Sequence, residues 1–169
     1  MKSVKYLCFF LALLLALAGC SDNEPQNAAV PQEHSSGEVL EEADPQGALD
    51  EIYKTIDMKG LEDADDTVLT EKFFIDTSKL EEYYVKYSSG RYGVADVFIL
   101  KASPEDTPSI RESLEQVKLN RMKEFENYDI HNSYGIAQNA QVFEQGGYVI
   151  MLMLEDLDGA REIIDRYIP

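Results

Sequence analysis

Residues 83–102 read YYVKYSSGRYGVADVFILKA, and this stretch decides the fold. Residues 83–87 are aromatic or β-branched apart from one lysine, which is typical of a β-strand. Residues 88–93 hold serines and glycines and predict a turn, and 94–102 predicts a second strand with a continuous apolar run at its centre. Neighbouring strands joined by a short loop pair antiparallel. The stretch therefore predicts a β-hairpin whose second strand lies in the core.

Three main helices are predicted around this hairpin, because apolar residues recur at the i, i+3, i+4, i+7 spacing of a helix face. Asp44 and Asp156 stand where the N-terminal caps of the first and last helix are expected. Arg121 interrupts the apolar stripe of the longest helix, and its aliphatic stem is expected to lie along the edge of the core. The predicted helices cover residues 45–57, 105–128 and the chain after Asp156.

A second hairpin is predicted where Gly146 and Gly147 separate two apolar stretches, 140–144 and 148–154, because both glycines accept the positive φ of a tight turn. The remaining segments are expected to form an acidic turn at 61–67, a short helical segment at 68–73, a capped turn at 76–80 and a loop at 129–139. The order helix-ββ-helix-ββ-helix predicts an α+β fold. Its helices are expected to cover one face of an antiparallel sheet of about four strands.

Tyrosines are concentrated in the first hairpin. Alternation along the strand places Tyr83 and Tyr87 on one face of the sheet and Tyr84 on the other. Ordinary packing against the sheet is one interpretation of this pattern. The other is a recognition surface that includes Tyr84 and Tyr92, since an exposed aromatic ring can bind a partner or stack on a sugar. The absence of tryptophan from the sequence weakens the sugar hypothesis.

The N-terminus has the pattern of a secretory leader. Lys2 and Lys5 precede an apolar run of 13 residues at 6–18, and small residues follow before a cleavage site. A run of this length is too short to span a bilayer, which requires about 20 residues.

Leu17-Ala18-Gly19-Cys20, at the end of this run, resembles the lipobox of bacterial lipoproteins. The resemblance implies that diacylglycerol alkylates the Cys20 thiol, that the chain is cut between Gly19 and Cys20, and that Cys20 becomes the first residue. Two or more acyl chains anchor a protein stably to a membrane. The alternatives are an ordinary cleavage without a lipid, or a free cysteine. Cys8 would leave with the leader, so the mature chain would hold no disulfide.

The chain is expected to have three parts: a leader at 1–19, a lipidated cysteine with an acidic tether at 20–46, and one globular domain at 47–169. The tether is rich in Pro, Gln, Asn, Ser and Glu and cannot bury enough apolar surface to order itself. A flexible chain of this length has a mean span of roughly 25–30 Å.

The chain is strongly acidic, with 15 basic and 32 acidic side chains and a net charge of −17. Such a charge repels nucleic acids and anionic lipids, so no nucleic-acid partner is expected. Solubility is one explanation for the acidity, and a surface for a basic partner or for divalent cations is the other.

Residues with recognisable chemistry are few. No Gly-x-Ser-x-Gly motif is present, and His131 is the only histidine of the predicted domain, in a segment predicted to be a loop. Without free cysteines it does not suffice for a zinc site, and no phosphate loop or dinucleotide motif is present. No catalytic residue, metal site or cofactor is therefore predicted. Asp63, Asp65 and Asp66 are a candidate cation site, although Val68 and Phe74 stand where a calcium loop needs Gly and Glu.

Most of the mature chain resembles a family of small bacterial lipoproteins of the Gram-positive type, whose C-terminal domain has no assigned function. The likeness lies in the lipobox, the acidic tether, a long charged helix, a last helix ending near Tyr167, and three short motifs. These motifs are Leu80 to Val85, Ala95 to Ile99, and Gly146 to Val149. The resemblance implies a domain and a location, on the outer side of the cytoplasmic membrane, but no catalytic residue.

These observations predict a lipid-anchored extracytoplasmic protein that is not an enzyme but an interaction or accessory module. Its expected partners are the membrane, through the lipid on Cys20, and an envelope protein. The alternative is a lipoprotein that binds a small ligand or a divalent cation. An enzyme is the third hypothesis, and it requires a cleft that gathers His131 or several acidic residues.

Overall fold

The computed structural model describes residues 42–169. The predicted leader, Gly19, Cys20 and nearly all of the predicted tether lie outside these residues. Among residues 42–169, no helix combines the length and apolar character that crossing a membrane requires.

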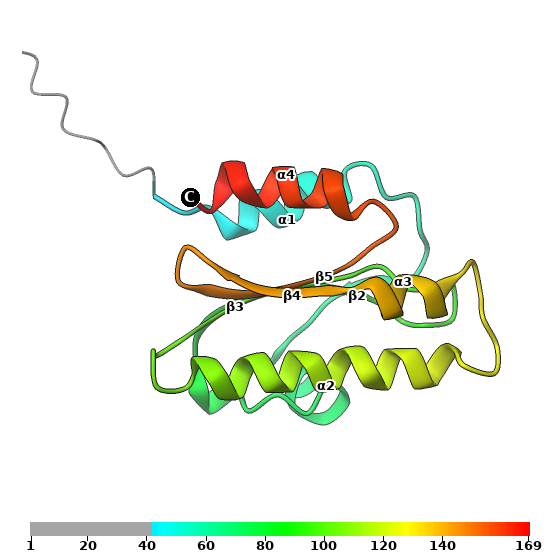
Figure 1. The fold of residues 1–169 in the computed structure, drawn as a ribbon, viewed down its shortest axis with the longest axis horizontal. Helices are drawn as coiled ribbons and strands as arrows, with labels where there is room; N and C mark the ends of the chain where they lie inside the picture. The colour runs from blue at the N-terminus through cyan, green and yellow to red at the C-terminus, as the bar shows by residue number, and fades with distance from the viewer. Residues whose placement is uncertain (1–41) are drawn as a thin grey trace, which may run out of the picture. The chain divides into compact units, whose positions relative to one another are not determined.

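A five-stranded antiparallel sheet forms the centre of the fold (Figure 1). The strands are ordered β1-β2-β3-β5-β4, so β3 is the middle strand. The two predicted hairpins are confirmed: β2 pairs with β3, and β4 pairs with β5 through the Gly146-Gly147 turn, whose φ angles are 55° and 82°. The bounds of the strands are Leu61–Asp63 for β1, Leu80–Ser88 for β2, Asp96–Ala102 for β3, Gln141–Gln145 for β4 and Tyr148–Met153 for β5.

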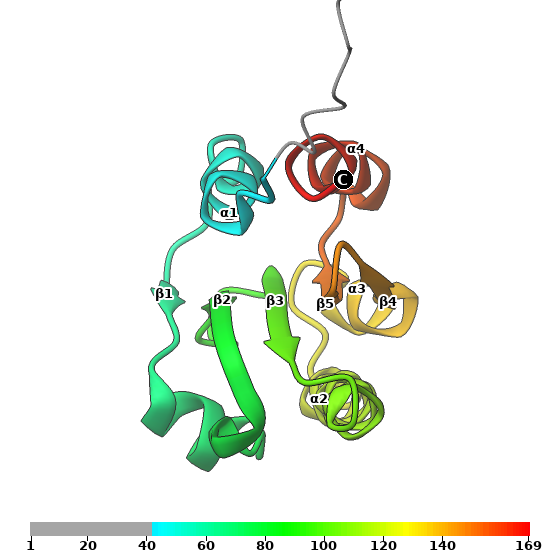
Figure 2. The ribbon, with the colours of Figure 1, turned by 90° about the vertical axis from the view of Figure 1, so that its left-hand side faces the viewer.

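Helices cover both faces of the sheet, which corrects the expectation of a single covered face (Figures 1 and 2). Helices α1 (Pro45–Tyr53) and α4 (Leu157–Tyr167) lie on one face. Helix α2 (Thr107–Phe125) and the π-helical segment η1 (Val68–Lys72) lie on the other. The reason is visible in β3, where Val97 and Ile99 pack with α1 and α4 while Phe98 and Leu100 pack with α2. A strand with a continuous apolar run, such as residues 97–100 here, is buried on both faces.

Two further elements differ from the sequence-based expectation. Residues 61–63 belong to the expected acidic turn but form the edge strand β1, because they pair with residues 86–88 of β2. The exposed carboxylate of Asp63 lies 3.0 Å from the ammonium of Lys86 across this pair. Helix α3 (Ser133–Asn139) lies inside the expected loop and packs beside α2. The sheet therefore has five strands instead of about four.

The helix caps are as predicted. The carboxylates of Asp44 and Asp156 accept hydrogen bonds from the backbone N–H groups of Gly47 and Gly159, and Asp76 caps the 3₁₀ turn η2 (Thr77–Lys79) in the same way. Helix α1 ends at Tyr53 instead of 57, and α2 is shorter than expected at both ends.

A buried ion pair joins α2 to β3. Arg121 and Asp96 are 3 % and 0 % exposed, and the guanidinium Nε and Nη2 lie 2.7 and 3.0 Å from the two carboxylate oxygens. Nη2 also donates to the backbone carbonyl of Ser88, whose own N–H donates to Asp96. The expectation that Arg121 would follow only the edge of the core is wrong, because its charged group enters the core to meet Asp96.

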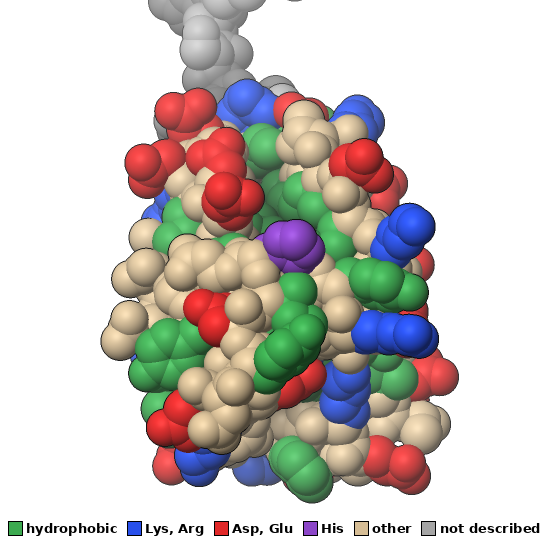
Figure 3. Space-filling model, turned by 90° about the vertical axis from the view of Figure 1, so that its right-hand side faces the viewer, with side chains coloured by type: hydrophobic (Ala, Val, Ile, Leu, Met, Phe, Trp, Pro, Cys, Tyr) green, Lys and Arg blue, Asp and Glu red, His purple; other side chains and the backbone are tan. Residues whose placement is uncertain are grey.

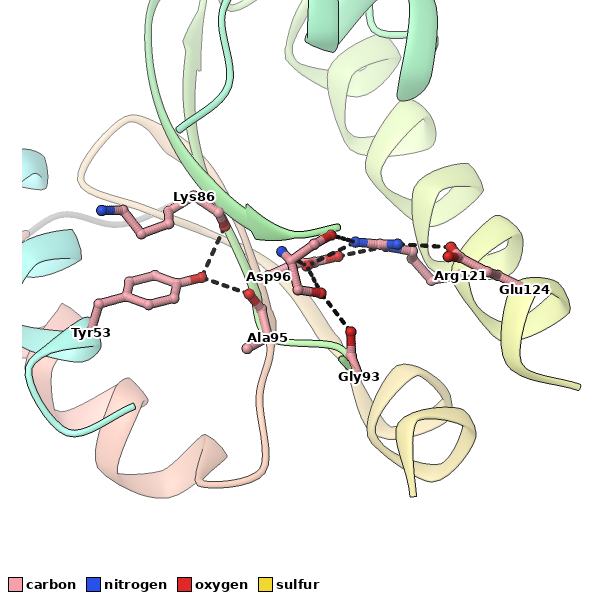
Figure 4. Close-up of polar contacts among 8 residues, drawn as sticks. Tyr53, Lys86, Gly93, Ala95, Asp96, Arg121 and Glu124 are labelled. Carbon is pink, nitrogen blue, oxygen red and sulfur yellow. Dashed lines mark hydrogen bonds and ion pairs between the residues drawn. The ribbon is translucent and has the colours of Figure 1, made fainter. Parts of the chain in front are cut away.

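A second residue reaches the same end of the hairpin from the opposite face of the sheet (Figure 4). The Tyr53 hydroxyl, on α1, lies 2.9 Å from the carbonyl oxygens of Lys86 and Ala95 and donates its proton to this pair of acceptors. Burial, and next the negative charge of Asp96, raise the pKa of this phenol well above its ordinary value. Tyr53 therefore remains a donor, and the end of the β2–β3 hairpin is fixed to both helical layers.

A second polar cluster joins three strands. Glu82 of β2 lies opposite Lys101 of β3, which in turn lies opposite Tyr148 of β5. One carboxylate oxygen of Glu82 accepts from Lys101 at 3.0 Å and from the Tyr148 hydroxyl at 2.8 Å, and the other accepts from Tyr84 at 2.9 Å. These donors, Lys101 first and then Tyr148, lower the pKa of Glu82.

Removing one partner of the buried ion pair is expected to destabilise the fold strongly. Asp96→Ala leaves the Arg121 guanidinium in the core without its carboxylate, which costs about 3–5 kcal/mol. The double variant Asp96→Ala/Arg121→Met removes both charges and is expected to recover part of this loss. Urea unfolding of the wild type, both single variants and the double variant measures the coupling.

Glu124→Gln is the matched control, because Glu124 is a half-exposed partner of the same arginine. Its loss is expected to cost less than about 1 kcal/mol. An Asp96→Ala variant no less stable than Glu124→Gln would contradict a central role for the buried pair.

The Glu82 cluster predicts a specific pH dependence. Because the pKa of Glu82 is lower in the folded chain than in the unfolded chain, its contribution is complete above the unfolded value and disappears as the pH falls through the folded value. Glu82→Gln is expected to destabilise the protein by about 1 kcal/mol near neutral pH. The difference from the wild type should shrink as the pH falls from 6 to 3.

Urea unfolding at several pH values measures this difference. Glu81→Gln is the control, since Glu81 is its exposed neighbour on β2. A difference between wild type and Glu82→Gln that stays constant over this pH range would refute the assignment.

Candidate binding cleft

A cleft of about 450 Å³ opens where the α1–α4 layer ends. Its walls come from the last turn of α1 and the chain after it, from the first turns of α4, from the loop before α3, and from residues next to the sheet. Most of the lining is apolar. The apolar residues are Ile52, Ile56, Met58, Val94, Ala95, Ile136, Leu154, Ala160 and Ile163.

The lengths of the helices explain why this end of the sheet is less covered. Helix α2 has 19 residues and extends about 28 Å, whereas α1 has nine and extends about 14 Å. The seven residues of β3 extend about 24 Å. Helix α2 can therefore follow the whole strand, but α1 ends short of it. The chain after Tyr53 leaves the sheet as a turn, and the cleft lies at this point.

The loop before α3 forms one rim of the cleft, and its backbone has unusual φ angles. His131 and Asn132 have φ angles of 51° and 59°, so two successive residues with side chains occupy the left-handed region. Such conformations are costly and concentrate at functional sites, although His and Asn tolerate them better than most residues. The following residue, Ser133, is fully buried, and its hydroxyl donates a hydrogen bond to the Ile130 carbonyl.

Gly93 connects this loop to the end of the first hairpin. Its φ of 114° is open only to glycine, and a Cβ placed there would lie 3.3 Å from the Ser133 hydroxyl. The Gly93 carbonyl accepts a hydrogen bond of 2.7 Å from the Ser88 hydroxyl (Figure 4). The residues after Gly93, Val94 and Ala95, are lining residues of the cleft. The buried network around Asp96 therefore holds one wall of the cleft in place.

The charged residues of the cleft are all acidic. Of residues 42–169, Asp57, Glu155 and Asp156 line it, and neither Lys nor Arg does. All three carboxylates belong to exposed residues. Asp156 is engaged as the cap of α4, with 2.9 Å to the Gly159 nitrogen, whereas the ion pairs found in residues 42–169 use neither Asp57 nor Glu155. These two carboxylates are available to a ligand.

Figure 3 looks onto this end of the molecule. Hydrophobic side chains line a hollow that lies next to the histidine, and acidic side chains gather beside it. His131 and Ser133 both line the cleft, but the Ser133 hydroxyl directs its proton to a backbone carbonyl. The arrangement thus provides apolar walls and negative charge at the mouth, which suits binding.

The other residues predicted from the sequence lie away from this cleft. Tyr84 is half-buried in the α1–α4 layer, where its hydroxyl donates to Glu82. Tyr92 is 40 % exposed in the turn of the first hairpin. The structure thus does not bring these two rings into one cluster with the cleft, and a recognition role for them stays a prediction.

The three aspartates of the candidate cation site have separate partners. Asp63 pairs with Lys86, Asp65 accepts from the backbone N–H of Val68 at 2.8 Å, and Asp66 accepts from the Tyr83 hydroxyl at 2.6 Å. In the described part of the chain, no group of three or more His, Cys, Asp or Glu side chains is arranged to hold a metal ion.

The cleft itself could not be read from the sequence. Ile52, Ile56 and Ala160 belong to the stripes that predict ordinary helix packing. That residues 42–169 leave an open cleft beside them becomes visible only in three dimensions. No signal in the sequence marked the turn at His131-Asn132, because the segment 129–139 was expected to be a loop and carries Gly135.

The cleft is expected to bind a neutral apolar dye such as Nile red. Ile163→Gln places an amide on a half-exposed wall residue of α4. We expect it to weaken the binding of the dye by about tenfold, because the bound dye would exclude the water that hydrates the amide. Leu119→Gln is the control, since Leu119 is 49 % exposed on α2. Fluorescence titration measures both affinities, and equal losses in the two variants would contradict binding in the cleft.

Comparisons with known proteins place the domain in a family. No curated protein and no solved structure matches the chain. The family model described as Domain of unknown function (DUF4358) matches residues 54–154, a range that includes all five strands, α2 and α3. Helices α1 and α4, which form two walls of the cleft, lie outside the matched range. Because the match covers more than half of the chain, the protein belongs to the DUF4358 family.

Proposed function

We propose that this chain is a lipid-anchored binding module on the extracytoplasmic side of the membrane, and that the cleft between α1 and α4 receives part of a partner protein. The lipid is carried by Cys20, and the segment from there to the start of α1 at Pro45 is the tether. The single observation that carries the binding role is the open apolar cleft of about 450 Å³. Ligand sites have this size and this mostly apolar lining.

The energetics of the lining support this role. Apolar side chains gain about 25 cal/mol per Å² when they leave water. Several wall residues, among them Ile56, Ile136 and Ile163, are only half-buried in the chain alone. A partner that covers them adds burial that the fold does not provide by itself. Concave apolar surfaces of this kind mark binding sites more often than scattered exposed residues do.

The anchor is supported by the sequence. The basic start, the 13-residue apolar run and Leu17-Ala18-Gly19-Cys20 agree with one another as a lipoprotein leader. A tether with a mean span of roughly 25–30 Å would let the domain meet partners near the membrane surface.

Binding is favoured over catalysis by the geometry around His131. The serine that lines the same cleft, Ser133, is buried and donates to the Ile130 carbonyl, so it is not positioned as a nucleophile for His131. The cleft does gather His131 and three acidic residues, as the enzyme hypothesis requires, and the non-catalytic role that we propose rests on the engagement of Ser133. A small apolar ligand is the second candidate occupant, because the volume also lies within the range of small-molecule sites.

Photo-crosslinking in intact cells tests the proposal. A benzoylphenylalanine placed at Thr55, an exposed residue that lines the cleft, is expected to capture a discrete protein. The same group at Glu115, an exposed residue of α2 on the other layer, is the matched control and should not capture it. The Cys20→Ala form, which lacks the lipid attachment site, should lose the adduct.

The possible results separate the candidates. An adduct from Thr55 alone, dependent on Cys20, supports the tethered module. Identical adducts from Thr55 and Glu115 would refute the cleft as the binding site. No adduct from Thr55, together with a small molecule that co-purifies and stabilises the chain, would favour the small-ligand function.

A further inference from the structure

We propose that the occupant of the cleft is a basic segment of a partner protein that presents two large apolar side chains flanked by Lys or Arg. This inference rests on the proposed function and specifies the chemistry of the partner. Two independent features of the cleft carry it, namely its volume and its charge.

The volume of the cleft determines how many large apolar side chains the ligand can insert. An apolar cavity of about 150 Å³ takes up one benzene molecule. The cleft of about 450 Å³ has room for two or three groups of that size. One inserted side chain would leave much of it filled with water against apolar walls. Two neighbouring large side chains of a short peptide segment fill it better.

The negative charge of the cleft determines which residues should flank the apolar pair of the ligand. Asp57 follows α1 and Glu155 precedes α4, so the two available carboxylates come from two different segments of the lining. In the described part of the chain, no Lys or Arg lines the cleft. A segment with basic residues on both sides of its apolar pair would bring positive charge to each carboxylate, whereas an acidic segment would meet repulsion. Charge of one sign around a site also speeds association with partners of the other sign.

The same charge disfavours other occupants. A second copy of this chain carries a net charge of −17 and would be repelled. The chain's own segment 21–44 contains seven Asp or Glu residues and no Lys or Arg. Anionic lipid headgroups are disfavoured for the same reason. A basic partner is the occupant that meets both the apolar walls and the acidic rim.

Synthetic peptides test the chemistry directly. The protein is the Cys20→Ala chain from residue 20 onward, and the probe is Lys-Lys-Leu-Phe-Lys-Lys with blocked ends. We expect saturable binding by calorimetry that weakens as the salt concentration rises. A peptide with Glu in place of every Lys, and one with Ser in place of Leu and Phe, should each bind at least about tenfold more weakly.

Charge-neutral variants locate the interaction. Asp57→Asn/Glu155→Gln is expected to lower the affinity for the lysine peptide about tenfold while leaving the binding of Nile red unchanged. The matched control is Glu112→Gln/Glu115→Gln, which changes the net charge equally at two exposed positions of α2. This control keeps the affinity within about twofold if the rim carboxylates, and not the overall charge, attract the peptide.

The outcomes distinguish this inference from the proposed function. Equal affinity for the Lys and Glu peptides, or equal losses in the two double variants, would overturn the basic partner. A failure of all three peptides to bind would overturn the peptide ligand. In each of these cases, a Thr55 adduct that persists in cells in the Asp57→Asn/Glu155→Gln background would leave the cleft as a binding site for a partner of another chemistry.

Discussion

The buried pair between Arg121 and Asp96 is the interaction on which the rest of the structure depends. It lies where β3 begins, and it fixes the middle strand of the sheet to the longest helix. Taking two charges out of water is expensive, and the attraction between them compensates only when the geometry is good and the remaining groups are satisfied. Here both carboxylate oxygens and three guanidinium nitrogens have partners, so these requirements are met. A pair of this kind specifies one arrangement of α2 on β3.

This constraint extends to the cleft through the backbone. The carboxylate of Asp96 accepts a hydrogen bond from the backbone N–H of Ser88, and the Ser88 hydroxyl donates to the carbonyl of Gly93. The Tyr53 hydroxyl donates to the carbonyls of Lys86 and Ala95. The turn between β2 and β3 is therefore bound from both faces, although turns are usually mobile. A wall that is fixed before a ligand arrives lowers the entropy lost on binding.

The sequence predicted what depends on local pattern and missed what depends on contacts between distant residues. The apolar run at 97–100, the glycines at 146–147 and the aspartate caps each specify their own neighbourhood, and these elements formed as expected. Edge strand β1 did not follow from its sequence, because Glu62 and Asp63 have low strand propensity and only pairing with β2 makes them extended. Arg121 and Asp96 were each unusual in an apolar pattern, but their pairing across 25 residues required the fold. Of the candidate site residues within 42–169, only His131, which was considered and set aside, lies in the cleft.

The position of the cleft also bears on the proposed anchor. The backbone N–H of Asp44 donates to the carbonyl of Tyr167, so the start of α1 lies beside the end of α4, and the two helices run in opposite directions. The cleft uses the other end of each helix, from Ile52 onward in α1 and up to Ile163 in α4. A tether that joins the domain at residue 44 is therefore attached at one end of the α1–α4 layer, and the cleft opens at the other. An anchored domain of this design would leave its binding site clear of its own attachment point. In the proposed anchored form, the seven acidic residues of segment 21–44 would also disfavour occupation of the acidic cleft by the chain's own tether.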